Sequence, residues 1–373
     1  MSGARIELFQ PVHLPVMEDA ALEVIRSGQI AAGSSVAAFE ESFAAIAGRG
    51  HMVSTSDLTS AVTLALHLSG VRSGDSVATL AFSCLQSNSP IVKLGARPVW
   101  IDIDPGTLSM SLNDLSSKLT PSVKAVMVYH VAGYPADTDR ISTLCQERGI
   151  PLIEDCNNAI GARLNGASIG SFGDYAVYSF YPNRQINGFD GGMLSTPNSE
   201  AAARASRLRR FGIDAQSFRD TRGEINPNSD VAEIGWSASL SNLHAAVALS
   251  QLDSLQNRLD RTFTLATNLI NEISLLKKVR PIEPLSGGRS AFWGCLVLAD
   301  DRDDFLAYLK ERGIKASILH QRNDHYSGFG NEQTFLPGTD MVMEKILALP
   351  CGWWLSNKQF DKIVTAIRDY DRF

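Results

Sequence analysis

The feature that most constrains the fold is a regular alternation of short apolar runs and amphipathic segments. The apolar runs predict buried strands at 51–54, 76–80, 97–103, 124–130 and 151–153. The amphipathic segments between them predict helices at 56–69, 86–94, 112–119 and 138–149. This alternation is typical of an α/β protein with a large, doubly wound and mainly parallel sheet.

Polar residues follow two of the apolar runs. The run at 151–153 continues into Asp155, and a second run at 175–180 leads into a polar loop that contains Arg184. Functional groups in parallel sheets gather at the carboxyl ends of the strands. We therefore expect Asp155 and Arg184 at the functional edge of the sheet.

The length of the chain predicts more than one domain, because 373 residues exceed the usual size of one compact core. A long helix is expected at 241–272. Beyond residue 280 the pattern changes to a smaller α/β unit, with strands at 292–298 and 315–319 and helices at 303–313 and 358–370. We expect a large domain with the N-terminal segment at 1–255 and a small C-terminal domain at 256–373.

Composition excludes several classes of protein. The net charge of −6 argues against a nucleic-acid partner. The chain has no signal-peptide pattern, and no apolar run reaches the roughly 18–20 residues of a membrane span, so we expect a cytoplasmic protein without a membrane partner. The five cysteines are scattered without a CxxC pair, which favours reduced thiols and indicates no metal site.

The block at 151–196 resembles the signature of the DegT/StrS-type sugar aminotransferases, which are fold-type I enzymes that use pyridoxal 5′-phosphate (PLP). The family motif E-D-x-x-Q/N-x-x-G is matched at 154–161. The motif S-F-x-x-x-K is matched at 179–184 except at its last position. The family has its Schiff-base lysine there, and this chain has Arg184.

The resemblance implies a set of cofactor contacts. Asp155 would hold the protonated ring nitrogen, and Asn158 would bond the ring hydroxyl. Ser179, Thr59 and Ser60 would bind the phosphate, since a helix beginning near Thr59 leaves backbone N–H groups free. A plain N-cap is the alternative interpretation of the Thr59 segment.

Three further positions match less closely. Cys84 stands where the family has an aromatic residue that stacks on the ring, with Phe82 close by. His130 lies in an H-x-x-G segment that the family places beneath the cofactor, and the alternative is a structural histidine at a strand end. Ser237 occupies the place of an asparagine that reaches the phosphate of the neighbouring subunit, so the resemblance also implies a homodimer with shared sites.

The polar turn at 320–325 is similar to segments of family members that act on nucleotide sugars. Arg322, Asn323 and His325 are therefore candidate substrate contacts. A solvated surface turn is the alternative interpretation.

Arg184 limits the chemistry that the resemblance implies. A guanidinium group stays protonated and is neither an amine nucleophile nor a base. None of the ten lysines falls between residues 125 and 276, so the whole signature region lacks an amine. The predicted catalytic set is Arg184, Asp155 and His130, with the usual amine missing.

Three hypotheses follow. The first is an aminotransferase-like enzyme of secondary-metabolite or cell-surface sugar biosynthesis that acts on a sugar, nucleotide sugar or keto intermediate. It would hold PLP, or its amine form PMP, without a covalent aldimine. The second is PLP-independent chemistry, without a cofactor, in which Arg184 holds an anion. The third is an inactive paralogue that binds sugar or pairs with an active subunit.

Overall fold

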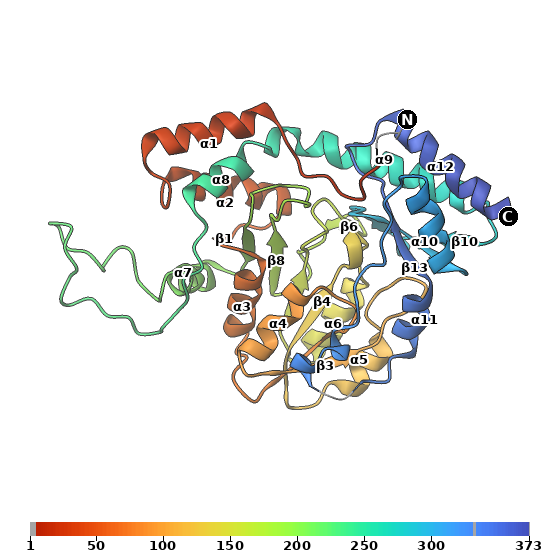
Figure 1. Ribbon diagram of the computed structural model, residues 1–373. Coiled ribbons are helices and arrows are strands. Elements are labelled where there is room, and N and C mark those ends of the chain that lie inside the picture. Colours follow the sequence, from red (N-terminus) through yellow and green to blue (C-terminus); the bar gives the residue numbers. More distant parts are fainter. Residues whose placement is uncertain (1–4, 331–332, 373) are drawn as a thin grey trace.

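The computed structural model describes residues 5–330 and 333–372 and has a central seven-stranded sheet (Figure 1). The strand order is β1-β9-β8-β5-β4-β2-β3. The strands are β1 (Met52–Thr55), β2 (Ser76–Leu80), β3 (Arg97–Ile101), β4 (Val123–Tyr129), β5 (Leu152–Asp155), β8 (Tyr175–Ser179) and β9 (Gly192–Ser195). Pairing from β3 through β2, β4 and β5 to β8 is parallel, and β9 is antiparallel to both of its neighbours. The predicted α/β fold with a mainly parallel sheet is confirmed.

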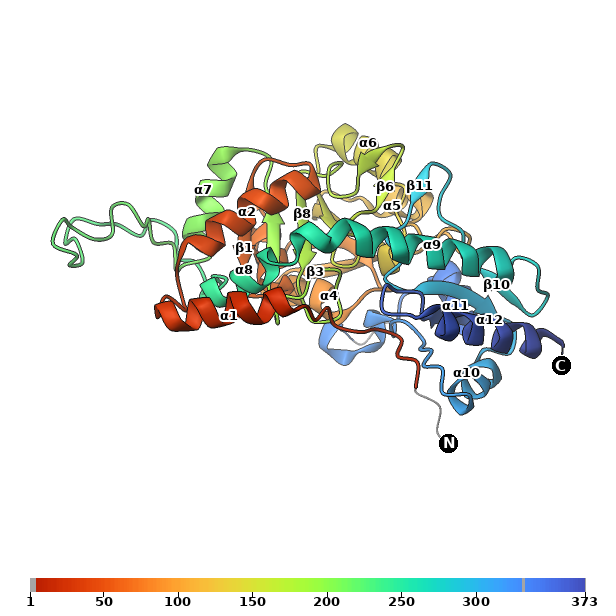
Figure 2. The same ribbon diagram turned by 90° about the horizontal axis from the view of Figure 1, so that it is seen from above.

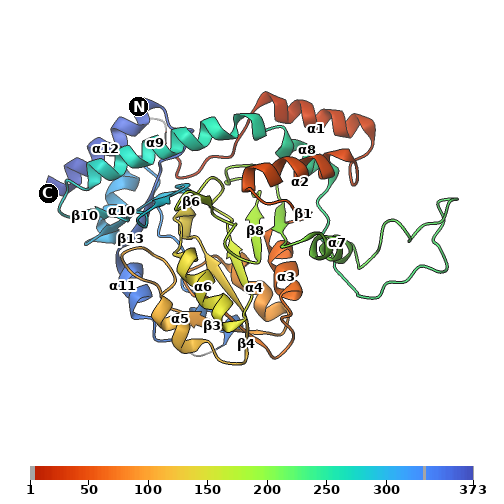
Figure 3. The same ribbon diagram turned by 180° about the vertical axis from the view of Figure 1, so that it is seen from behind.

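Helices cover both faces of this sheet because successive residues of each strand point to opposite sides. One face packs on α3 (Leu58–Leu68), α4 (Leu85–Lys93) and α7 (Ser199–Leu208), and its strand residues include Val77 and Met127. The other face packs on α5 (Leu112–Lys118) and α6 (Thr138–Arg148), and its strand residues include Ala78 and Val126 (Figure 3). Both faces are apolar, so the sequences of the strands are continuous hydrophobic runs.

The C-terminal part forms a second, antiparallel sheet in the order β10-β12-β13. Its elements are β10 (Val279–Pro281), β12 (Cys295–Ala299), α10 (Arg302–Glu311), α11 (Pro337–Lys345), β13 (Ile346–Leu349) and α12 (Asn357–Arg372). Short 3-10 turns η3 (Asn323–His325) and η4 (Ser327–Phe329) precede α11. A third small sheet joins β6 (Arg163–Leu164), β7 (Ala167–Ser168) and β11 (Gly288–Arg289).

Helices at the N-terminal end flank the central sheet. These are α1 (Pro15–Ser27) and α2 (Ser34–Ala47), which pack against α8 (Asn242–Leu249), while α9 (Leu255–Ile273) runs from there toward the C-terminal sheet (Figure 2). A division near residue 255 remains our proposal, and α9 begins there. The first described residues depart from this division, because Ile6 forms a bridge with Ile314 of the C-terminal unit.

The single long helix expected at 241–272 is wrong, because it is broken between α8 and α9 by the 3-10 turn η2 (Leu252–Ser254). Gln251 is fully buried at the break. Its side chain donates to the carbonyl oxygens of Asn187 and Val247 and accepts from the Asn187 N–H. The break therefore satisfies a tertiary contact that no local pattern encodes.

Two strand predictions in the C-terminal unit need correction. The segment 315–319 forms only an isolated bridge between Ser317 and Ala348. The strand predicted at 292–298 begins at Cys295, since Phe292 has a left-handed φ of 49° that ends extended pairing.

An irregular segment at 213–233 projects from the body of the molecule in all three views (Figures 1, 2 and 3). Its backbone consists of turns, bends and isolated bridges. Within the described ranges, no helix has the length and apolar character needed to cross a membrane.

Candidate active site

The carboxyl ends of β4 and β5 bring together a group of side chains that we call the Asp155 cluster. Its members are Ser87 of α4, Cys84 at the start of α4, Tyr129 of β4, Asp155 of β5, Asn157, Asn158, Arg184 after β8, and His320. Parallel pairing of β4 with β5 places Tyr129 opposite Asp155. The predicted meeting of Asp155 and Arg184 at one edge of the sheet is thus seen in the structure.

Asp155 is the last residue of β5 and is fully buried. Its carboxylate accepts from Ser87 Oγ at 2.5 Å and from the backbone and side-chain nitrogens of Asn157 at 3.1 and 2.9 Å. Burial raises the pKa of Asp155, while these hydrogen bonds act in the opposite direction. The arrangement suits a group that donates a hydrogen bond, such as a protonated ring nitrogen.

Asn158, Tyr129 and His320 form a chain of hydrogen bonds beside Asp155. Asn158 Nδ2 donates to the Tyr129 hydroxyl at 2.8 Å, so this hydroxyl can donate to His320 Nε2 at 3.1 Å. Burial and the nearby charge of Arg184 lower the pKa of His320 to about 4. His320 also has a φ of 49°, which is uncommon for a residue other than glycine and is often found at functional sites.

Arg184 is buried, with 6% of its surface exposed. It donates to Asn183 Oδ1 at 2.6 Å, and its guanidinium carbon lies 4.9 Å from the centre of the Trp293 ring. No carboxylate in the described parts of the chain forms an ion pair with it. Burial lowers the pKa of Arg184, and the charge of Asp155 is among the groups that oppose this shift.

Several buried polar atoms in and beside the Asp155 cluster have no partner among the described residues. They are Ser83 Oγ, Asn157 Oδ1, Asn158 Oδ1, Arg184 Nε and Gln185 Oε1. Buried polar groups are nearly always hydrogen-bonded, so such a concentration indicates a place where a polar ligand binds.

His130, a predicted catalytic residue, is fully buried behind this cluster. Its Nε2 lies 3.3 Å from Glu154 Oε2, and its Nδ1 accepts from the Ala136 N–H at 3.1 Å. Both ring nitrogens are engaged, so the geometry favours the structural alternative over a catalytic role. His130, Glu154 and Cys156 lie close enough to hold a metal ion, but Glu154 also accepts three backbone N–H groups from residues 170–173.

Lysine is the residue that transamination chemistry requires, and all ten lysines lie within the described ranges. None of the ten is buried. No lysine is among the members of the Asp155 cluster defined above, whereas Arg184 is one of them.

The profile of the DegT/DnrJ/EryC1/StrS aminotransferase family matches residues 16–368. The chain belongs to this family. Among solved structures, AtS13 from Actinomadura melliaura is 32% identical, with 99% of this chain and 100% of that chain covered and a TM-score of 0.93. The aminotransferase TlmJ from Streptoalloteichus hindustanus is 31% identical, with 98% of each chain covered and a TM-score of 0.91. The sugar aminotransferase CalS13 from Micromonospora echinospora is 30% identical, with 98% and 99% covered and a TM-score of 0.92.

In this member of the DegT/DnrJ/EryC1/StrS family, the residues near Asp155 fit the ring of PLP, whereas those at the predicted phosphate site do not fit its phosphate. Asp155 and Asn158 offer an acceptor and a free amide oxygen to a pyridine ring. At the other end, helix α3 begins with the carboxylate of Asp57 as its N-cap. Ser60, a predicted phosphate ligand, uses both its N–H and its hydroxyl on that carboxylate. The residues at the predicted phosphate position do not fit a phosphate group.

The other predicted cofactor residues are placed as follows. Thr59 lies partly exposed in the first turn of α3, and Ser179 is buried at the end of β8 with its hydroxyl accepting from the Tyr181 N–H. Ser237 is exposed. Cys84 is partly exposed beside Ser87 and Asn157, so a contact with a ring at Asp155 remains a prediction.

The predicted substrate residues lie in and just before η3. Arg322 is buried and pairs with Asp324 and Asp340, and it also donates to a backbone carbonyl. Asn323 is buried and ties the turn to the carbonyl of Ser83. These contacts hold the turn in place, and a contact of Arg322 or Asn323 with substrate remains a prediction. His325 is exposed, and its contact with substrate remains a prediction.

Sequence reasoning missed Tyr129 and His320. Tyr129 ends the β4 strand, and His320 begins the polar turn that was singled out for its later residues. A position at a strand end was the available signal for Tyr129, but the approach of His320 to it depends on tertiary packing.

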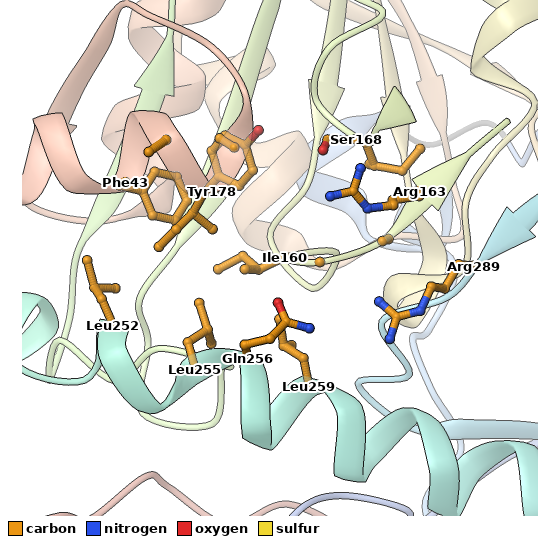
Figure 4. Close-up of a pocket in the computed structure, with 16 residues that line it drawn as sticks. Phe43, Ile160, Arg163, Ser168, Tyr178, Leu252, Leu255, Gln256, Leu259 and Arg289 are labelled. Atoms are coloured by element: carbon orange, nitrogen blue, oxygen red, sulfur yellow. The ribbon is translucent and has the colours of Figure 1, made fainter. Parts of the chain in front are cut away.

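A separate pocket of about 300 Å³ lies between α2, α9 and β8 (Figure 4). Its wall contains Phe43, Tyr178 and Leu259, and Arg163 and Arg289 also line it. It shares no residue with the Asp155 cluster.

Proposed function

We propose that this protein acts on a sugar, nucleotide sugar or related keto intermediate in secondary-metabolite or cell-surface sugar biosynthesis, and that it does so without a covalent link to PLP. The observation that carries the proposal is the burial of Arg184 near Asp155. We assign Arg184 to the position of the family's Schiff-base lysine from the spacing of the motif at 179–184.

The substrate class rests on family membership and on the description of CalS13 as a sugar aminotransferase. Spr1654 from Streptococcus pneumoniae, which shares the fold at 19% and 20% identity, has been solved in a PLP form and a PMP form. In this chain the missing amine argues against the lysine-dependent transfer of an amino group.

The retained polar cluster argues that ligand binding persists. A fully buried Asp155 and the unpartnered atoms of Asn157 and Asn158 are costly to keep in a core without a function. Family members that had lost all binding would gain stability by replacing them with apolar residues.

A second candidate function is supported by the charge of Arg184. A buried guanidinium without a carboxylate partner is a strong binding group for an anion, because it can pair in a bidentate manner with a carboxylate or phosphate. PLP-independent chemistry on a substrate that carries such an anion fits this geometry.

The test is to incubate the protein with PLP and with pyridoxal, reduce with borohydride and measure the intact mass. We expect no pyridoxyl adduct on the wild type beyond the level of surface labelling. Arg184→Lys should gain one adduct that maps to position 184. Arg163→Lys is the matched control, because it adds a lysine at an exposed position.

A wild-type adduct on a peptide near Asp155 would refute the proposal. An Arg184→Lys variant that gains none, with an unchanged melting temperature, would show that the residues around Asp155 no longer accept a pyridine aldehyde.

We also propose a homodimer. The projecting segment at 213–233 and its flanks expose large apolar side chains, with Phe211 at 52%, Ile225 at 59% and Ile234 at 77% exposure. Exposed apolar groups along one extended segment are typical of an interaction surface. Light scattering should give twice the chain mass, and a monomer at all concentrations would contradict the proposal.

A further inference from the structure

We infer that the N-terminus of α3 in this chain excludes a phosphate group. The ligand of the Asp155 cluster therefore carries no phosphate on the part that lies near this helix. The inference deepens the proposed function, on which it rests, because it names the ligand class of the same site. It comes from the way the chain's own carboxylate fills the helix terminus.

Asp57 is the N-cap of α3 and occupies the position of an anion. Its Oδ1 accepts from the Ser60 N–H at 2.8 Å. Its Oδ2 accepts from the hydroxyls of Ser60 and Ser56 at 3.0 and 2.7 Å. Three donors that point to the helix terminus are thus bound to a negative charge from the chain itself.

A helix N-terminus attracts phosphate through its free N–H groups and its positive dipole end. Asp57 offsets both contributions, since it occupies the Ser60 N–H and two serine hydroxyls and adds a negative charge. A phosphate dianion placed on the remaining N–H groups would lie next to this carboxylate. Repulsion between such neighbouring charges lowers affinity by on the order of 100-fold.

A second acidic residue, Asp190, precedes the strand β9 that meets this terminus. Burial raises the pKa of Asp190 and the charge of Asp57 also raises it, while the Gly191 N–H and His244 act in the opposite direction. Gly192 brings strand β9 close to this terminus, since a Cβ there would lie 2.4 Å from the Asp57 carbonyl oxygen. The nearby Arg209 is already paired with Glu40 and Ser54.

The first turn of α3 packs against the rest of the chain on one side. Leu58 is the first helical residue and is 1% exposed, so its side chain packs into the core at this turn. The segment that carries Ser237 and Ser239 lies alongside, with Ser239 bridging to Thr55 and its hydroxyl donating to the Arg209 carbonyl. The Ser239 hydroxyl is therefore engaged with Arg209 and does not replace the donors that Asp57 occupies.

The experiment compares pyridoxine 5′-phosphate with pyridoxine, which differ in the phosphate and cannot form an imine. Equilibrium dissociation constants are measured by calorimetry for the wild type, Asp57→Asn and Asp253→Asn. Asparagine keeps the N-cap acceptor and removes the charge. Asp253 is exposed on η2, so its variant controls for the loss of one negative charge.

We expect the wild type to bind the phosphorylated compound no more tightly than pyridoxine. Asp57→Asn should bind pyridoxine 5′-phosphate at least tenfold more tightly than the wild type does, with pyridoxine affinity unchanged, and Asp253→Asn should match the wild type. A melting temperature within a few degrees of the wild type confirms that the cap is intact.

A wild type that binds pyridoxine 5′-phosphate tenfold more tightly than pyridoxine would overturn the inference, and so would an Asp57→Asn variant with no gain. The outcome is separable from that of the proposed function. Tight binding of the phosphate compound without a borohydride-fixed adduct would defeat only this inference, and a wild-type adduct with pyridoxal would defeat only the proposed function.

Discussion

Lowering the pH from 7 to 4 should destabilise the protein through His320. The folded chain holds the pKa of His320 at about 4, against a value of 6.5 in the unfolded chain. Burial is the main cause, and the positive charge of Arg184 adds to it. The unfolded state therefore takes up a proton as pH falls through 6.5, while the folded state resists until about pH 4.

The sign follows from this difference. Above pH 6.5 both states are neutral at this residue, and His320 has no effect on the pH dependence. Below pH 6.5 the unfolded state is stabilised by protonation, so the free energy of unfolding decreases. The loss is about 1 kcal/mol at pH 6, about 2 kcal/mol at pH 5 and about 3 kcal/mol at pH 4.

Urea denaturation at several pH values measures the effect, with His320→Asn as the reference because asparagine tolerates the left-handed backbone and does not titrate here. Other groups titrate in both proteins, so the difference in stability between the two isolates His320. We expect this difference to change by about 3 kcal/mol between pH 7 and pH 4. His325→Asn controls for the loss of an exposed histidine.

A difference between wild type and His320→Asn that stays constant within 1 kcal/mol from pH 7 to pH 4 would refute the reasoning. It would mean that His320 protonates as easily in the folded chain as in the unfolded one, and that it does not lie beside a buried cation.

Two further predictions concern buried polar groups. Arg184→Met should raise the free energy of unfolding by about 1 kcal/mol, because it removes a buried cation that has no ion pair. Arg209→Met should lower the free energy of unfolding by about 2 kcal/mol, because it leaves the Glu40 carboxylate without its partner. Thermal and urea unfolding of both variants would check the opposite signs, and a loss of stability in both would contradict the account of Arg184. Gln251→Ala should lower the free energy of unfolding by about 3 kcal/mol, since it removes three hydrogen bonds of a fully buried side chain. The control Gln256→Ala, on the exposed face of α9, should change the free energy of unfolding by less than about 0.5 kcal/mol. Equal effects of the two variants in urea unfolding would show that the break between α8 and α9 does not depend on the Gln251 contacts.

The sequence predicted the parts of the fold that depend on local periodicity. The strands that end in Tyr129 and Asp155 are buried on both faces, so their residues are continuously apolar and easily recognised. The helix break at Gln251 could not be found in this way, because its acceptor at Asn187 lies more than sixty residues away along the chain.

Local sequence and tertiary structure also contributed different information about the candidate site. Motif spacing identified Asp155, Asn158 and Arg184, and the order of parallel strands placed them at one edge of the sheet. Spacing gave no information on hydrogen-bond partners, and only the structure shows that the carboxylates of Asp324 and Asp340 bind Arg322.

The sequence by itself determined the α/β sheet and the family resemblance, and it led us to predict that Arg184 replaces the family's lysine, because each of these depends on residue type and order. Only the tertiary structure decided that Asp57 fills the terminus of α3, that His130 is fully engaged, and that His320 reaches Tyr129. The physical reason is that charge, burial and hydrogen-bond partners depend on which segments meet in space, and Tyr129 and His320, for example, lie 191 residues apart along the chain.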